Sequence, residues 1–167
     1  MSSLSSTDGT ALPPSAQRVQ DALAAAGSSA RVVPLAVAAR TSQQAADALG
    51  IEVGRIAKSL VFRGAESGRA VLVIAAGDRR VNEQKLAAAA GEPLQRAQPE
   101  FVREHSGFAI GGVAPIAHAK PMLTFVDDSL RRFDIVWAAG GTPHCVFPIA
   151  PLELLRLSGG RELQLAQ

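Results

Sequence analysis

Residues 107–121, GFAIGGVAPIAHAKP, are the stretch around which the rest of this chain is arranged. Gly111 and Gly112 lack a Cβ atom, so their main chain can adopt positive φ angles and another group can approach it closely. Pro115 fixes its own φ and removes one N–H donor, which stiffens the turn. A loop of this kind can present main-chain N–H groups as a small concave site for an anion or a carbonyl. A structural turn between two strands is the alternative, and the loop alone does not separate the two.

A strand is predicted upstream of this loop over residues 55–63, RIAKSLVFR, because β-branched and aromatic residues are frequent in it. Alternation places Lys58 on the same face as Ile56, Leu60 and Phe62. A lysine on an inward face is costly unless it meets a partner or lines a cavity. The alternative is a lysine near the end of the strand whose ammonium group reaches water.

Helices and strands alternate along the rest of the chain. Helices are predicted after capping residues such as Ser15 and Thr41, over segments 16–26, 42–49, 83–90, 99–106 and 151–158. Strands are predicted over segments 31–37, 70–76, 122–126, 133–138 and 145–149. This pattern indicates an α/β (α+β) fold with a mixed sheet or partial barrel and helices packed outside it.

The length and composition of the chain are typical of a single domain, which we place at residues 15–167. The chain has 167 residues, 47% of them hydrophobic, and a formal net charge of +2, so any nucleic-acid site has to be a local basic patch. No segment is long and apolar enough to span a bilayer. The only cysteine, Cys145, excludes an internal disulfide and fits a reducing compartment. Residues 1–14 are rich in Ser, Thr and Pro without the features of a signal peptide, so we expect a disordered tail and a cytoplasmic protein.

Several kinds of catalytic site are not predicted. The three histidines lack metal-ligand spacing, and no nucleophile elbow, Walker loop or dinucleotide fingerprint is present, so we expect no metal and no cofactor. Cys145 is expected to be a half-buried structural thiol, and Asp127-Asp128 a solvated turn rather than a cation site. Lys58 and the Gly-Gly-x-x-Pro loop remain, without an evident general base. Such a site would act by electrostatic stabilisation and positioning.

Four stretches resemble the YbaK/prolyl-tRNA-synthetase-associated editing domains, a family of aminoacyl-tRNA deacylases. They are RIAKSLVF (55–62), AGDRRVNEQKLA (76–87), SGFAIGGVAPIAHAKPMLTFVDDSL (106–130) and WAAGGTPHCVFPIAPLELLRL (137–157). The lysine-bearing strand followed by the Gly-Gly-x-x-Pro loop is the most specific part of the resemblance, which spans most of residues 15–160. It implies a compact α/β domain with a mixed, strongly curved sheet, and hydrolysis of the ester that joins an amino acid to the 3′ end of tRNA.

The resemblance also assigns roles to individual residues. Lys58 matches the functional lysine of the family, which would hold the terminal phosphate or the aminoacyl group. Gly111, Gly112 and Pro115 match the loop that surrounds the aminoacyl carbonyl with main-chain donors. Lys58, Gly111 and Gly112 are therefore the expected catalytic residues. The expected substrate contacts are Val113, Ala114, Pro115, Ala117 and His144.

Two departures from the family pattern bear on the substrate. Ala114 and Ala117 stand where the Cys-tRNA(Pro) deacylases carry a serine and a glycine, so the polarity and width of the pocket are expected to differ. The turn at residues 142–144, Thr-Pro-His, also differs from that branch. We therefore expect another small mischarged residue such as alanine, serine or threonine, with cysteine as the alternative and tRNA(Pro) as a candidate carrier. Pocket shape alone separates near-isosteres by about 1–3 kcal/mol, which is why a separate editing step is useful.

Binding of tRNA would rest on local basic groups, of which Arg79, Arg80 and Lys120 are the expected contacts. A solvated basic face is the alternative for each of them. The expected partners are an aminoacylated tRNA 3′ end and, as a second candidate, an aminoacyl-tRNA synthetase, with no membrane involved. The competing hypothesis is a non-catalytic module of the same fold that binds a tRNA 3′ end or a synthetase.

Overall fold

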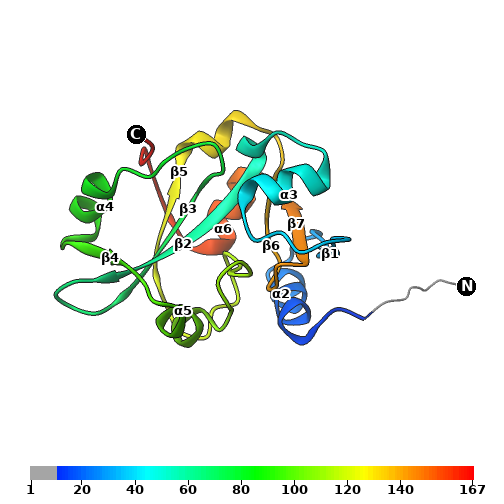
Figure 1. The fold of residues 1–167 in the computed structure, drawn as a ribbon, viewed down its shortest axis with the longest axis horizontal. Coiled ribbons are helices and arrows are strands. Elements are labelled where there is room, and N and C mark those ends of the chain that lie inside the picture. The colour runs from blue at the N-terminus through cyan, green and yellow to red at the C-terminus, as the bar shows by residue number, and fades with distance from the viewer. Residues whose placement is uncertain (1–10) are drawn as a thin grey trace, which may run out of the picture.

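Eight strands form one mixed sheet in the computed structural model, which describes residues 11–167 (Figure 1). The strands are β1 (Val33–Pro34), β2 (Ile56–Gly64), β3 (Ala70–Ala76), β4 (Leu94–Arg96), β5 (Leu123–Asp127), β6 (Val136–Ala139), β7 (Cys145–Ile149) and β8 (Arg161–Leu163). The α-helices are α2 (Pro14–Ala25), α3 (Ser42–Leu49), α4 (Glu83–Ala90), α5 (Pro99–Ser106) and α6 (Pro151–Ser158), and the 3-10 helices are η1 (Val53–Arg55) and η2 (Asp128–Arg132). Residues 1–10 of the predicted tail lie outside the described part of the chain.

The strand order is β1-β7-β6-β2-β3-β5-β8, and β4 pairs with β2 as well. Pairs β2–β6, β3–β5 and β5–β8 are parallel, while β2–β3, β2–β4, β6–β7 and β1–β7 are antiparallel. Figure 1 shows β2 crossing the middle of the molecule, with β3 and β5 on one side of it and β6 and β7 on the other. The predicted mixed sheet with helices outside it is confirmed, and the sheet is open because β1 and β8 form its two ends.

One edge of β2 is unpaired in its middle. The first two residues of β2 pair with β6, and its last three residues, from Phe62, pair with β4. Residues 58–61 lie between these pairings. The Val61 carbonyl accepts from the Ala97 N–H at 3.1 Å, and residues 58–60 have no strand partner on that edge among residues 11–167. The strands β4 and β6 therefore part around the middle of β2, which leaves room for a site there.

The two faces of the sheet bury separate apolar cores. Every residue of β3 is buried, and its side chains alternate between the core under α2, α5 and α6 and the core under α4. In β2, Ala57 and Val61 face the first core, whereas Leu60 and Phe62 face the second. The same alternation sends Lys58 to the α4 face and Ser59 to the opposite face.

Several helix boundaries follow the predicted capping residues. The Thr41 side chain accepts a hydrogen bond from the Gln44 N–H at 3.1 Å, and the Asn82 side chain caps α4 in the same way. The first helix differs, because α2 begins at Pro14, before the predicted cap Ser15, and has no side-chain cap. Proline suits the first turn of a helix because the missing N–H has no intrahelical partner there.

Two predicted strands are shorter than expected. The segment predicted at 31–37 contains only β1, since Pro34 has no N–H to continue the pairing. The strand predicted at 133–138 begins at residue 136, because η2 runs to Arg132 and the chain bends after it. The guanidinium groups of Arg55 and Arg132 lie 4.7 and 4.8 Å from the ring centre of Phe133 and hold that ring outside the sheet.

Two further strands were not predicted. β4 and β8 have three residues each and no apolar alternation that would distinguish them from a loop. Among the helices described for residues 11–167, none is long and apolar enough to cross a membrane.

Candidate functional site

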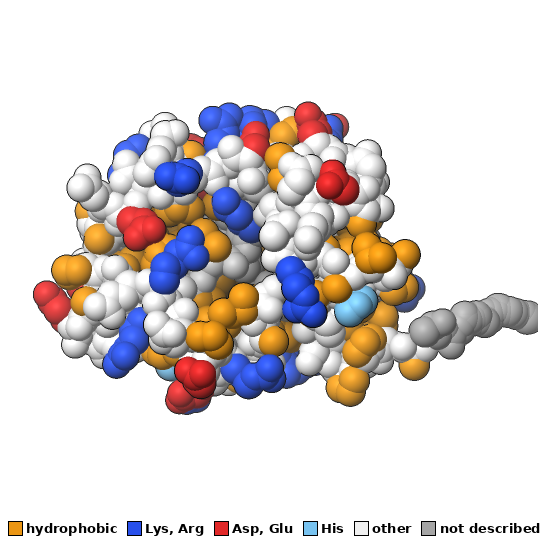
Figure 2. Space-filling view, viewed as in Figure 1, with side chains coloured by type: hydrophobic (Ala, Val, Ile, Leu, Met, Phe, Trp, Pro, Cys, Tyr) orange, Lys and Arg blue, Asp and Glu red, His pale blue; other side chains and the backbone are white. Residues whose placement is uncertain are grey.

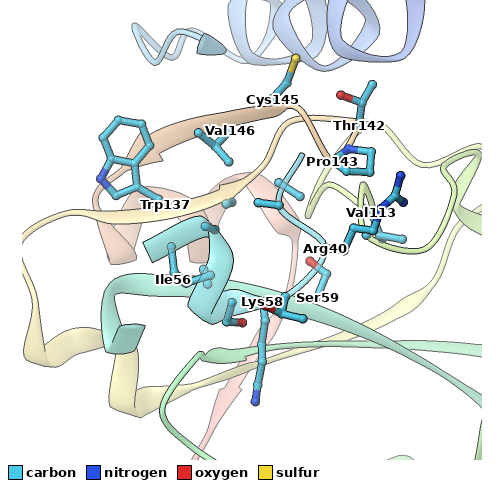
Figure 3. Close-up of a pocket in the computed structure, with 18 of the residues that line it drawn as sticks. Arg40, Ile56, Lys58, Ser59, Val113, Trp137, Thr142, Pro143, Cys145 and Val146 are labelled. Atoms are coloured by element: carbon cyan, nitrogen blue, oxygen red, sulfur yellow. The ribbon is translucent and has the colours of Figure 1, made fainter. Parts of the chain in front are cut away.

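A cavity of about 250 Å³ opens at the unpaired edge of β2 (Figure 3). Four parts of the chain form its walls: residues 39–45, the first half of β2, residues 110–113, and the β6–β7 hairpin. We call this space the acyl cavity. Its lining is mainly apolar, with Ile56, Val113, Trp137 and Val146 among its side chains. A small apolar group would find van der Waals contacts on several sides there.

The Gly-Gly loop forms one wall of the acyl cavity. Gly111 has a φ of 93°, in the left-handed region that favours glycine. The Gly112 N–H donates to the Ala109 carbonyl at 2.9 Å, and a Cβ on Gly112 would lie 2.7 Å from the Thr142 Cα, so this glycine lets two loops touch. The N–H groups of Gly111 and Val113 have no hydrogen-bond partner among the described residues. Both residues line the cavity, so both N–H groups are candidate donors to a carbonyl oxygen.

Polar contacts hold the loop in place from behind. The Arg18 guanidinium donates to the Gly107 carbonyl at 3.1 Å, and the His118 Nε2 lies 2.8 Å from the Ala114 carbonyl oxygen. Because a carbonyl can only accept, His118 donates from Nε2. Burial lowers the pKa of His118, which favours the neutral ring that makes this contact.

Lys58 is one of the residues that line the acyl cavity, but its ammonium group points out of this cavity. Figure 3 shows the side chain directed away from Val113, Trp137 and Cys145. The Nζ donates to the Arg79 carbonyl at 2.7 Å. Burial, and next the charge of Arg96, lowers the pKa of Lys58. The lysine and the loop that were predicted as one site therefore lie on opposite faces of β2 and meet at its open edge.

Ser59 occupies the position opposite Lys58, and it was not among the predicted site residues. Its hydroxyl is buried and has no hydrogen-bond partner among residues 11–167. The residue lines the acyl cavity and also a narrower space of about 100 Å³ that continues past Gly111 and Ile110. The alternation used to place Lys58 could have found Ser59, because the residue after an inward lysine must face the other side of the strand.

A second cavity, of about 870 Å³, lies on the α4 face of β2. It contains the Lys58 side chain together with the predicted tRNA contacts Arg79 and Arg80, and with Arg96 from β4, which was not predicted. We call it the basic cavity. Figure 2 shows Lys and Arg side chains gathered around the hollowed face that carries β2, α4 and α5.

Five of the predicted contacts lie away from the two cavities. The side chains of Ala114 and Pro115 are buried behind the loop, and Ala117 is half-buried there. His144 is exposed, although its neighbours Pro143 and Cys145 line the acyl cavity. Lys120 is paired with Glu104 at 2.7 Å. The roles assigned to these residues as substrate or tRNA contacts stay predictions.

The side chains of the acyl cavity limit its chemistry. Its lining contains no Asp, Glu or His, and among residues 11–167 no three His, Cys, Asp or Glu side chains gather as a metal site would require. Cys145 lines the cavity as a buried thiol, and Asp127, predicted as a solvated turn residue, is instead buried. The arrangement can bind an acyl group and donate hydrogen bonds to its carbonyl, but it offers no side-chain carboxylate or imidazole as a base.

Comparison with known proteins gives a consistent picture. The family model described as "Aminoacyl-tRNA editing domain" matches residues 36–157. The uncharacterised protein YwhH of Bacillus subtilis is 37% identical over 118 residues, which are 71% of this chain and 74% of YwhH. EbsC of Enterococcus faecalis, provisionally named as a Cys-tRNA(Pro)/Cys-tRNA(Cys) deacylase, is 29% identical over 72% of this chain and 74% of its own.

Solved structures and longer enzymes match as well. A crystal structure described provisionally as a trans-editing enzyme for prolyl tRNA synthetase superposes with a TM-score of 0.88 at 46% identity, over 94% of this chain and 99% of the other. The proline–tRNA ligase of Thermosipho melanesiensis is 41% identical over 78 residues, which are 46% of this chain and 14% of the ligase.

Proposed function

This chain belongs to the aminoacyl-tRNA editing domain family, and from that premise we propose that it hydrolyses the ester between a mischarged amino acid and the 3′ end of tRNA. The observation that carries the proposal is the acyl cavity. It offers a small apolar space beside two main-chain N–H groups, on Gly111 and Val113, that have no partner among the described residues. The relatives named as deacylase and trans-editing enzyme support the same reaction.

The N–H groups of the loop would act on the ester carbonyl. When water attacks the carbonyl carbon, negative charge develops on its oxygen, and preorganised N–H donors stabilise that charge more than they stabilise the substrate. Removing one such donor typically slows a reaction about 10²–10³-fold. The left-handed φ of Gly111 and the anchoring of Ala114 by His118 fix the direction of these donors before the substrate arrives.

The attacking water would be positioned rather than deprotonated by a side-chain base. The acyl cavity has no Asp, Glu or His in its lining, and its hydroxyl groups come from Thr41, Ser42, Ser59 and Thr142. The Ser59 hydroxyl is buried without a partner among the described residues, so we propose that it and the free hydroxyl of the terminal ribose position the water. Holding water and ester in a reactive arrangement lowers the barrier by removing the entropy cost of bringing them together.

The substrate we propose is a small amino acid on tRNA. A cavity of about 250 Å³ with mainly apolar walls has room for the side chain of alanine, serine, threonine or cysteine. The match to proline–tRNA ligases and the description of the neighbouring structure favour tRNA(Pro) as the carrier, with this chain acting in trans to the ligase.

Single-turnover deacylation tests the proposal. We would mix excess protein with tRNA(Pro) carrying alanine, serine, threonine or cysteine, and with cognate Ala-, Ser- and Thr-tRNAs. Lys58→Ala and Ser59→Ala would be compared with Arg31→Gln, an exposed cation that lines neither cavity. We expect turnover of at least one mischarged tRNA by the parent and Arg31→Gln, and slower turnover by the other two. If the parent shows no rate above spontaneous hydrolysis on any tRNA, the chain is a binding module rather than a deacylase.

A further inference from the structure

We propose that Arg18, on helix α2, is a positioning residue for the acyl cavity: it holds the start of the Gly-Gly loop so that the N–H groups of Gly111 and Val113 point towards the ester carbonyl. This inference rests on the proposed function and deepens it. Arg18 lines neither the acyl cavity nor the basic cavity, so it would act through the loop rather than on the substrate. Helix α2 precedes residues 36–157, so the match to the family model does not include it.

The Arg18 guanidinium contacts the start of the Gly-Gly loop in two ways. Its Nη2 donates to the Gly107 carbonyl at 3.1 Å, and its central carbon lies 4.2 Å from the ring centre of Phe108. The Phe108 side chain is 1% exposed, so the guanidinium lies against a ring that the core holds in place. Arg18 forms no ion pair within 4.0 Å among residues 11–167, so no described carboxylate competes with these two contacts.

The main chain fits closely against this guanidinium where it leaves helix α5. The Gly107 N–H donates to the Arg103 carbonyl at 2.9 Å and so closes the helix. A Cβ on Gly107 would lie 2.6 Å from the Arg18 Nη2, so a larger residue would displace the arginine. The direction in which the loop begins is therefore fixed by α5 on one side and by Arg18 on the other.

The first turn of α2 supports the facing wall of the acyl cavity. A Cβ on Gly141, in the β6–β7 turn, would lie 2.6 Å from the Ser15 carbonyl oxygen, so helix and turn are in main-chain contact. Figure 3 shows α2, in blue, next to the turn that carries Thr142. Thr142 in turn touches Gly112 and lines the cavity. Helix α2 thus contacts the start of the Gly-Gly loop and also the turn against which the tip of that loop packs.

The far end of the loop returns to the same place. The Ala119 N–H donates to the Ser106 carbonyl at 3.1 Å, which brings the two ends of the loop together. Near this end, the His118 ring donates to the Ala114 carbonyl. Burial is the main cause that lowers the pKa of His118, and the positive charge of Arg18 acts in the same direction. Arg18 therefore also favours the neutral state of the second side chain that anchors the loop.

Single-turnover kinetics tests this role. We would compare the parent with Arg18→Met, which keeps the length of the side chain, with Arg18→Lys, which keeps the charge and a donor, and with Arg31→Met, which removes the same charge from an exposed position outside both cavities. Because misplaced donors act on the transition state, Arg18→Met should lower the maximal rate about tenfold and change the protein concentration for half-maximal rate less than twofold.

The other two variants show whether the guanidinium contacts are responsible. Arg18→Lys should recover at least part of the lost rate, and Arg31→Met should match the parent. Urea unfolding under the assay conditions confirms that each variant is folded. A maximal rate of Arg18→Met within twofold of the parent would overturn the proposal, as would a loss that Arg18→Lys does not reduce.

Nuclear magnetic resonance tests the positioning without any chemistry. In the parent, the order parameters of the Gly111 and Val113 N–H groups should lie near the rigid value of about 0.85, and in Arg18→Met they should fall towards the flexible range below about 0.6. The Leu72 N–H, at the centre of β3, should stay rigid in every variant. Unchanged order parameters at Gly111 and Val113 would overturn the positioning role.

The two measurements separate this inference from the proposed function. A parent that deacylates none of the tRNAs would refute the proposed function, while the order parameters would still decide whether Arg18 holds the loop. A parent that deacylates and an Arg18→Met variant that is equally fast and equally rigid would refute the positioning role alone.

Discussion

Ala117 is the one residue other than glycine with a positive φ, 65°, among residues 11–167. It lies in the loop that follows Pro115, two positions after the residue that stiffens the turn. A side chain in the left-handed region costs about 1–2 kcal/mol because its Cβ approaches the following carbonyl oxygen. The loop therefore carries a local strain that its anchors, such as the contact from His118 to Ala114, have to hold.

Ala117→Gly should relieve this strain. Glycine removes the Cβ but adds freedom to the unfolded chain, which offsets about 0.5–1 kcal/mol, so the free energy of unfolding should rise by about 0.5–1 kcal/mol. Urea denaturation of the two proteins measures this difference. Ala119→Gly, at a nearby exposed position without a positive φ, should leave stability unchanged or lower it. A lower stability for Ala117→Gly than for the parent would contradict the prediction.

Ser59→Ala should separate a functional hydroxyl from a structural one. The hydroxyl is buried without a partner among the described residues, so its removal should leave the free energy of unfolding unchanged or raise it by about 1 kcal/mol. Removing one hydrogen bond to the reacting water should slow single-turnover deacylation about tenfold, which corresponds to about 1.4 kcal/mol. A variant that is markedly less stable, or as fast as the parent, would show that Ser59 does not have the proposed role.

Among the secondary-structure elements, the loop after β5 is held by one buried carboxylate. Asp127 is 1% exposed and accepts from the main-chain N–H groups of Leu165 and Ala166 at 2.6 and 3.0 Å, and from that of Ser129 at 3.2 Å. It thereby connects the start of η2 to the segment after β8, which runs beside Arg80 at the rim of the basic cavity. The sequence predicted a solvated turn here because Asp-Asp-Ser is a common turn sequence and the partners of Asp127 are distant in the chain.

Asp127→Ala should be strongly destabilising for this reason. It leaves the buried N–H of Leu165 and the partly buried N–H groups of Ala166 and Ser129 without their acceptor. A buried unsatisfied N–H costs about 1–3 kcal/mol and a partly buried one less, so we expect the free energy of unfolding to fall by about 2–4 kcal/mol. The neighbouring Asp128→Ala removes an exposed carboxylate and should change stability by less than about 0.5 kcal/mol. Thermal and urea unfolding of the pair measure the contrast, and equal effects would show that the buried hydrogen bonds matter little.

The strands show which structural features the local sequence pattern predicts and which it does not. The alternation in RIAKSLVFR correctly predicted a face shared by Lys58, Leu60 and Phe62, because that information is contained in neighbouring residues. Ile56 was predicted on the same face, but it packs in a separate apolar cluster with Ala45 and Ala46 of α3. It did not predict that β4 and β6 pair with the two ends of β2 on one edge, since the pairing joins segments far apart in the chain. Arg96 was missed as a site residue for the same reason: β4 is short and polar, and only its partner strand brings it to the basic cavity.

At the scale of the whole protein, the cations that surround β2 affect the stability of the fold. Burial, and next Arg96, lowers the pKa of Lys58, with Arg80 acting in the same direction and Asp78 opposing them. Because the folded-state pKa lies below the unfolded one, the charged ammonium destabilises the fold at pH values below the folded pKa. That cost disappears as pH rises through the folded pKa towards the unfolded value.

The parent should therefore gain stability relative to Lys58→Met as pH rises from about 7 to about 10. Methionine has a similar length and no charge, so the absence of the hydrogen bond to the Arg79 carbonyl adds an offset that does not depend on pH. Urea unfolding of both proteins at the two pH values gives the difference directly. A difference that stays constant, or that grows in favour of Lys58→Met, would contradict this prediction.

The residues of the candidate site could be predicted in part. The Gly-Gly loop and Lys58 were identified from type and spacing, and Gly111 and Val113 do line the acyl cavity. The sequence did not predict that the Gly-Gly loop and the Lys58 ammonium group lie on opposite faces of β2. A strand with one open edge has the same alternation of side chains as a strand that is paired on both edges. His144 and Lys120 were chosen for their chemistry next to the right motifs, and the structure places both away from the two cavities.

The walls of the acyl cavity are formed by segments that are far apart in the sequence, from residues 39–45 to the strand β7. A ribosome has to release nearly the whole domain before these walls can meet, so a nascent chain that stops before Cys145 has no enclosed space for an acyl group. Recovery of activity during refolding should then require the pairing of β7 with β6 and not only the burial of β3. The proposed catalyst cannot act on the tRNA pool of its own cell until synthesis of this domain is almost complete, and partial translation products carry no hydrolytic risk.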